Sequence, residues 1–140
     1  MTALRMLMLV LILAPVVLVI DLVWLGVVMK GFYAQEIGSL MRRSGDSLTP
    51  RWSAALLVYL LIPAGLVLFV RPLIVEPATV WQALGWGAAF GLVLYGVYDM
   101  TNLAVLENWT WKVAIADIAW GGVLCGITTL VMRATDRWLR

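Results

Sequence analysis

Three aspartates stand inside the most apolar stretches of the sequence. Asp21 occurs in IDLVWLG, Asp99 in YDMTNLA and Asp117 in ADIAWGG. A charged side chain in the middle of a membrane helix costs about 2.5–3.5 kcal/mol on insertion scales, and such residues usually serve a function. No Lys or Arg lies within these stretches to neutralise the carboxylates. The three aspartates are therefore the candidate catalytic residues.

The aspartates have neighbours that can donate hydrogen bonds, which a buried carboxylate needs. An indole follows two of them at i+3, and a tyrosine and an asparagine share a helical face with Asp99 at i−4 and i+3. A further tyrosine, Tyr59, falls opposite Asp21 when positions are counted from the two ends of the first loop. The predicted ligand-binding residues are Trp24, Tyr59, Tyr95, Tyr98, Asn102 and Trp120.

The spacing predicts that the three aspartates meet in one layer. At about 1.5 Å per helical residue, each lies roughly 8–14 Å below the same membrane surface. Around the turn ENWT, Asp99 falls opposite Asp117. The motifs GAAFG and GVLCG flank this pair, and small residues at such spacing let two helices approach closely. We expect them to pack the third helix against the fourth, with homodimer formation as the alternative.

Such a layer could be stable in three ways. The carboxyl groups could be protonated, hydrogen-bonded within a wet cavity, or bound to a cation. Asp21, Asp99, Asn102 and Asp117 offer hard oxygen ligands that suit Mg²⁺, Ca²⁺ or Mn²⁺. If the protein is an enzyme, one aspartate would act as a general acid or base, or a metal would act as a Lewis acid.

Other chemistry is excluded by composition. The sequence has no histidine and a single cysteine, Cys125. We therefore expect neither a haem nor a zinc site, and no internal disulfide. A net charge of +2 gives no indication of nucleic-acid binding.

The elements that must position the aspartates are membrane helices. Of the 140 residues, 64% are hydrophobic and 13% charged, against about 45–50% and about 25% in soluble domains. The fold class is all-α, and residues 1–140 form a single integral membrane domain. Four stretches reach the roughly 20 residues that span a bilayer. They cover about residues 4–29, 52–70, 80–106 and 111–132.

Short connections make neighbouring helices antiparallel, so we expect a four-helix bundle of up-down-up-down topology. The first loop is longer and predicts a short interfacial helix, followed by a turn at SGDSLTP. The side chains that could line one side of this helix are Phe32, Tyr33, Ile37, Leu40 and Met41.

Basic residues are divided evenly between the two ends of the bundle. Both termini are expected on the same side of the membrane. The three arginines of the C-terminal tail favour the cytoplasm for that side. One end has Arg5, Arg71, Arg133, Arg137 and Arg140, and the other has Lys30, Arg42, Arg43, Arg51 and Lys112.

Three motifs together carry a family resemblance. DLVWLG followed by GFY, YDMTNLAVLENW and ADIAWGG resemble the bacterial membrane proteins grouped as domain of unknown function 2177. The likeness covers nearly the whole chain. The resemblance implies a four-helix protein of the bacterial inner (cytoplasmic) membrane and favours a lipid-related role, but it supplies no catalytic residues.

The leading interpretation is an intramembrane polar pocket that binds or modifies a lipid or another apolar small molecule. One alternative is a non-catalytic subunit that assembles with a larger membrane complex. Another is a structural polar core in which the hydrogen bonds only fix the helix register. An ion or proton pathway is disfavoured because the opposite half of the bundle offers few polar side chains. The expected partners are membrane lipids, a second copy of the chain or a larger complex.

Overall fold

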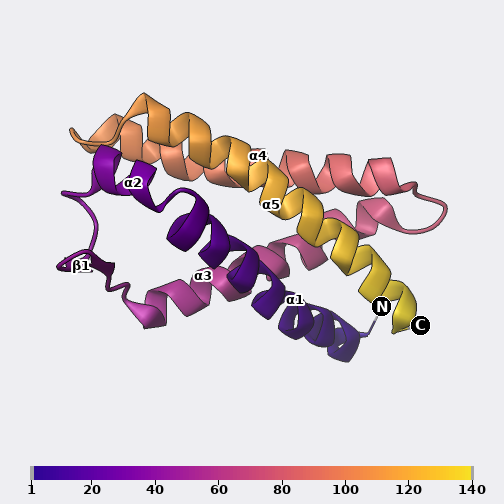
Figure 1. The fold of residues 1–140 in the computed structure, drawn as a ribbon. Helices are drawn as coiled ribbons and strands as arrows, with labels where there is room; N and C mark the ends of the chain where they lie inside the picture. The colour runs from indigo at the N-terminus through magenta and orange to yellow at the C-terminus, as the bar shows by residue number, and fades with distance from the viewer. Residues whose placement is uncertain (1, 140) are drawn as a thin grey trace.

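The computed structural model describes residues 2–139 and consists almost wholly of helices (Figure 1). Met1 and Arg140 lie outside the described residues. In chain order the elements are α1 (Ala3–Val23), the π-helical turn η1 (Trp24–Val28), α2 (Lys30–Ile37), β1 (Arg43–Ser44), β2 (Ser47–Leu48), α3 (Trp52–Gly65), the π-helical turn η2 (Leu66–Val70), the 3-10 turn η3 (Arg71–Ile74), α4 (Val80–Val105) and α5 (Trp111–Trp138).

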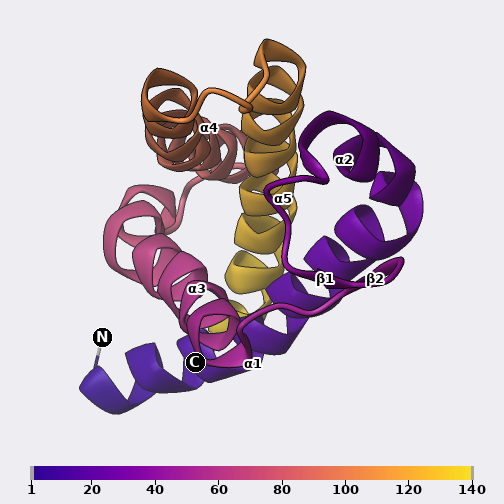
Figure 2. The ribbon, with the colours of Figure 1, turned by 90° about the vertical axis from the view of Figure 1, so that its left-hand side faces the viewer.

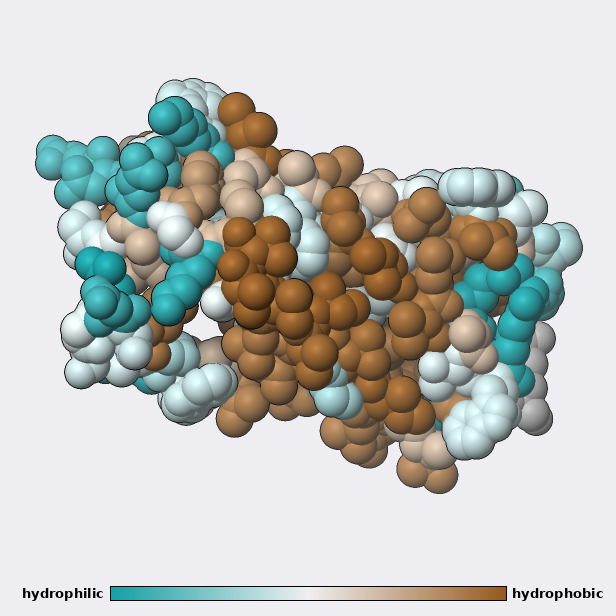
Figure 3. All heavy atoms as spheres, in the orientation of Figure 1, coloured by the Kyte–Doolittle hydropathy of each residue, from teal (hydrophilic) through white to brown (hydrophobic). Residues whose placement is uncertain are grey.

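Four helical segments within residues 2–139 are long and apolar enough to cross a membrane. Their surface forms a broad apolar band between two polar ends (Figure 3). The predicted all-α fold with four membrane helices is therefore confirmed. The segments are Ala3–Val28, Trp52–Ile74, Val80–Val105 and Trp111–Trp138.

The fourth helix extends further than predicted. Hydropathy falls after Met132, which led to the expected end there, but α5 continues to Trp138. The added turns hold Arg133, Asp136 and Arg137, whose side chains find partners on other elements. The second span is also longer than predicted, since η2 and η3 carry it to Ile74.

The glycine motifs pack α4 directly against α5. A Cβ atom added at Gly91 would lie 1.9 Å from the carbonyl oxygen of Gly121, and one at Gly87 would lie 2.2 Å from Thr129 Oγ1. No side chain fits at either position without moving the opposite backbone or a buried side chain. The prediction that these motifs join the two helices is confirmed, and the resulting antiparallel pair is visible in Figure 1.

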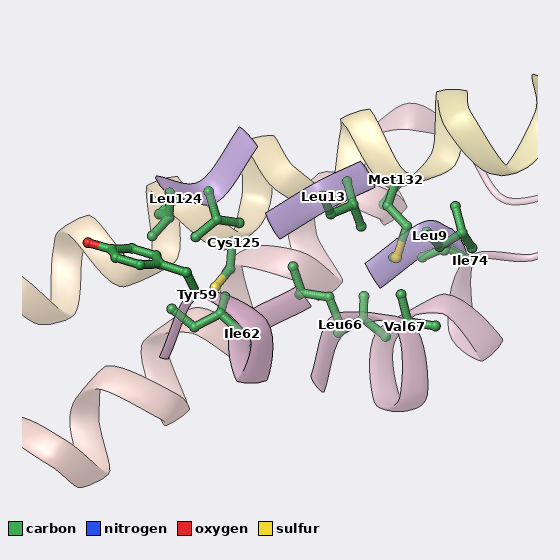
Figure 4. Close-up of a cluster of buried hydrophobic side chains, with 13 residues drawn as sticks. Leu9, Leu13, Tyr59, Ile62, Leu66, Val67, Ile74, Leu124, Cys125 and Met132 are labelled. Carbon is green, nitrogen blue, oxygen red and sulfur yellow. The ribbon is translucent and has the colours of Figure 1, made fainter. Parts of the chain in front are cut away.

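The hydrophobic core runs along the inside of the bundle (Figure 4). Leu9, Leu13 and Val17 of α1 pack with residues of α3, η2 and α5. Tyr59 stands at one end of this cluster with its hydroxyl directed away from it, whereas Ile74 and Met132 stand at the other end. The core therefore separates two polar regions of the molecule.

The first loop contains the predicted short helix, α2, which packs on the protein. Tyr33 and Ile37 are buried and contact Val113 at the start of α5. Glu36 accepts a hydrogen bond from the Thr110 hydroxyl at 3.0 Å. Figure 2 shows α2 beside α5, with the loop then crossing to α3. The predicted turn is present as a two-stranded ribbon, β1 and β2, closed by Gly45 at a φ of 60°.

Candidate functional site

Asp21 is held by hydrogen bonds from two other helices. It lies at the end of α1 and is 7% exposed. The Tyr59 hydroxyl donates to one carboxylate oxygen at 2.8 Å, and the Trp120 indole N–H donates to the other at 2.9 Å. The Tyr59–Asp21 pairing expected from the loop register is thus observed. Both carboxylate oxygens have a partner, so Asp21 joins α1, α3 and α5.

Trp24 and Trp120 form a stacked pair at the centre of the layer. Their ring centroids are 4.2 Å apart and their planes differ by 2°. The sequence suggests that each indole donates a hydrogen bond to the aspartate of its own helix, but the observed hydrogen bonds run between helices. Trp120 of α5 donates to Asp21 of α1, whereas Trp24 donates to the Tyr33 hydroxyl at 3.1 Å. An indole at i+3 shares the aspartate's face, yet its N–H points outward to the neighbouring helix.

Tyr33 connects this pair to the second aspartate. Its hydroxyl donates a hydrogen bond to Asp117. Burial raises the pKa of Tyr33 above its ordinary value, and the hydrogen bond to Asp117 raises it further. The phenol therefore keeps its proton and remains a donor. In this way α2, which lies outside the spans, fixes a carboxylate of α5.

Asp99 is the least satisfied of the three aspartates. Its side chain is completely buried. One oxygen accepts a hydrogen bond from the Trp109 indole at 3.3 Å, while Oδ2 has no partner among residues 2–139. The Asp117 carboxyl group lies within hydrogen-bonding distance. A proton held between the two carboxyl groups would give Asp99 Oδ2 a partner.

A bound cation is one of the three ways in which the sequence leaves the layer stable. Among the described residues, no three Asp, Glu, Cys or His side chains come together as a metal-binding group. Asp21 is directed toward Tyr59 and Trp120, and Asp99 toward Asp117. Asp21, Asp99 and Asp117 therefore do not come together as one metal-binding group within the described part of the chain.

The remaining predicted site residues lie around the edge of the layer. The Tyr95 ring packs over Gly121, where an added Cβ would lie 2.4 Å from it. Tyr98 is 55% exposed, is hydrogen-bonded to Asn102 and contacts the Trp109 ring edge-on at 5.9 Å. Asn102 thus serves Tyr98.

An apolar hollow lies on the outer face of α4, next to this edge. It has a volume of about 410 Å³. Tyr98 closes it at the end nearest Asp99, and Trp109 lies between Tyr98 and the Asp99 carboxylate. The hollow is lined by Phe90, Val93, Leu94, Val97 and Tyr98.

Comparison with known proteins gives one match. The family model described as "Predicted membrane protein (DUF2177)" matches residues 6–133. The chain belongs to this family. No curated protein and no solved structure matches it. The matched segment of this DUF2177 protein contains all three aspartates and every side chain that donates a hydrogen bond to them.

Two hydrogen-bond donors of the aspartate layer in this DUF2177 protein, Tyr33 and Trp109, were not among the predicted site residues. Tyr33 was expected only on an interfacial helix. The signal for Trp109 is its place in the turn ENWT between Asp99 and Asp117, where an indole can reach back to either helix. For Tyr33 no sequence signal exists, because its position depends on how η1 redirects the chain into α2.

The layer does not continue through the DUF2177 bundle. Thr128 and Thr129 are completely buried, but their hydroxyls donate to the carbonyl oxygens of Leu124 and Cys125 in their own helix, each at 2.7 Å. The rest of the core cluster is apolar. The polar groups of the described residues therefore form separate regions at the two ends.

Proposed function

We propose that this protein binds a lipid, or a similarly apolar molecule, against α4, with the hydrogen-bonding head of the ligand beside Tyr98 and Asp99. The single observation that carries the proposal is an open apolar hollow lined by Tyr98, whose sequence neighbour Asp99 has a buried carboxylate oxygen with no partner among residues 2–139. A ligand head that carries a hydroxyl or ammonium donor would satisfy Asp99 Oδ2.

The walls of the hollow support an apolar ligand. Val93 and Val97 are 68% and 66% exposed, and all lining residues except Tyr98 are purely hydrocarbon. A hydrocarbon chain gains little by leaving one apolar environment for another, so affinity must come from shape and from the polar end. Trp109 covers Asp99 through a hydrogen bond of 3.3 Å, which is long for an N–H donor. Its displacement would expose the carboxylate to the ligand.

Substitution of Val93 by Trp tests the hollow, because a bulky ring would fill it. The protein would be purified in a mild detergent, and the retained lipids quantified by mass spectrometry. We expect Val93→Trp to lower the retained lipid per protein at least twofold. Val19→Trp is the matched control, since Val19 of α1 is 60% exposed and does not line the hollow.

The polar end is tested with Asp99→Asn and Asp99→Leu. Asp99→Leu removes both acceptor oxygens, whereas Asp99→Asn preserves the shape but replaces one acceptor oxygen with a donor N–H₂ group. We expect both variants to lose lipids whose heads carry donors while Val19→Trp retains them. Normal lipid retention in Val93→Trp and in both Asp99 variants would contradict the proposal. A stoichiometric protein partner that survives all of these substitutions would instead favour an assembly subunit.

A further inference from the structure

The end of the bundle opposite the aspartate layer holds a cluster of arginines. Arg5 comes from α1, Arg71 from η3, and Arg133 and Arg137 from successive turns on one face of α5. They surround Asp136, which is 6% exposed, and Glu76. The contact between Arg5 and Asp136 also brings the two ends of the described chain together (Figure 1).

Cationic groups outnumber carboxylates in this cluster. Asp136 pairs with Arg5 at 2.8 Å and with Arg71 at 3.0 Å, and Arg137 donates to Glu76 at 2.7 Å. Arg133 donates to the carbonyl oxygen of Ala78 at 2.7 Å. Among the described residues, four guanidinium groups therefore share two carboxylates.

The cluster also has an excess of hydrogen-bond donors. The Nε atoms of Arg5, Arg71 and Arg133 are buried and have no acceptor within residues 2–139. Each guanidinium carries five N–H donors in a fixed plane, so the acceptors named above satisfy only part of the set. A group rich in oxygen acceptors is what such a cluster lacks, because an unmet buried donor is costly.

The floor of the cluster is apolar. A small hollow of about 10 Å³ is lined by the apolar side chains of Ile74 and Met132 and by the charged side chains of Arg71, Glu76, Arg133, Asp136 and Arg137. It can hold at most one water molecule, so a larger ligand must lie across its mouth. Figure 4 shows Ile74 and Met132 at one end of the hydrophobic core. A molecule bound there would have its head on the arginines and its chains along the band.

We infer that the arginine cluster binds the phosphate of an anionic phospholipid. The planar guanidinium matches phosphate oxygens with paired hydrogen bonds. Basic pockets at the edge of a membrane helix bundle bind anionic lipid heads in this manner. Arg133 is the principal binding residue, since its hydrogen bond goes to the backbone carbonyl of Ala78 and not to a carboxylate. This inference does not depend on the hollow of α4.

The test measures melting temperature in a neutral detergent. Phosphatidylglycerol, phosphatidylcholine with the same acyl chains, and inorganic phosphate would each be titrated into the full-length protein. We expect phosphatidylglycerol alone to raise the melting temperature. Arg133→Gln should weaken the apparent affinity for it about tenfold or more, as loss of a charge-assisted hydrogen bond predicts. Arg51→Gln is the control, because it removes the same charge from an exposed side chain at the other end.

Three results would overturn the inference. They are an equal response to phosphatidylcholine, the same response to inorganic phosphate alone, and an unchanged affinity for phosphatidylglycerol in Arg133→Gln. If Arg133→Gln does not fold, Arg133→Lys carries the test, since it keeps the charge but loses the paired donors. A several-fold weaker affinity would then support the inference, and an affinity equal to that of the wild type would overturn it.

Discussion

Asp117 and Asp136 lie on the same helix, yet their surroundings are opposite in kind. They are 19 residues apart in α5, or about 28 Å, close to the thickness of a bilayer core. Asp136 is paired with Arg5 and Arg71. Asp117 and the other aspartates of the layer accept bonds from Tyr and Trp side chains. One end therefore neutralises buried charge with cations, and the other accommodates it with neutral donors.

The two ends should therefore differ in how much stability the protein loses when a carboxylate is removed. In an ion pair, removal of the carboxylate leaves a buried guanidinium unpaired. In the pair Asp99 and Asp117, removal of one carboxylate relieves a repulsion between like groups. The same Asp→Asn substitution should therefore destabilise one end and spare the other.

The largest effect is expected for Asp136→Asn. Loss of the charge leaves Arg5 and Arg71 without a carboxylate, and breaking a buried pair in this way costs about 3–5 kcal/mol. The free energy of unfolding would be measured by titration with sodium dodecyl sulfate in mixed micelles.

Asp99→Asn is the matched comparison at the other end. Its amide can donate a hydrogen bond to the neighbouring Asp117 carboxylate, so we expect the free energy of unfolding to change by less than about 1 kcal/mol. If Asp99→Asn costs as much as Asp136→Asn, the two ends do not differ in the way described.

Much of the aspartate layer could be predicted because it depends on local register. The turn ENWT is so short that it fixes Asp99 opposite Asp117, and the close approach at Gly91 and Gly121 keeps them there. Tyr59 could be placed opposite Asp21 by the same count across the first loop. The four spans follow from hydropathy alone, since a bilayer requires long apolar helices.

The partners that come from distant segments could not be predicted. Tyr33 reaches Asp117 only because η1 ends at Val28 and the chain folds back as α2, a change of direction that hydropathy does not encode. Arg5 and Asp136 are separated by 131 positions, and Arg residues at span ends are usually surface anchors. Charge pairing across such distances depends on tertiary packing.

A smaller effect is expected for Asp21→Asn. Asp21 accepts from Tyr59 and from Trp120, but an amide has only one acceptor oxygen and would direct its N–H₂ group at a second donor. We expect a loss of about 1–3 kcal/mol. Tyr59→Phe alone should cost about 0.6 kcal/mol, the usual value for such a bond in membranes. A double-mutant cycle measures the coupling, and additive costs would show that the two side chains do not interact in the membrane.

A modest effect on the aspartate layer, which depends on pH, is expected for Tyr33→Phe. At pH 7 the variant loses the bonds to Asp117 and Trp24 and should be about 1 kcal/mol less stable. The pKa of Tyr33 is raised in the folded protein above its ordinary value of 10.0. The unfolded chain therefore loses this proton first, and the contribution of Tyr33 is full below pH 10 and declines as the pH rises further. The difference between the wild type and Tyr33→Phe should narrow by on the order of 1 kcal/mol between pH 9 and 11, while all other tyrosines, present in both proteins, cancel. A difference that stays constant over this range would mean that Tyr33 is not a buried donor to Asp117.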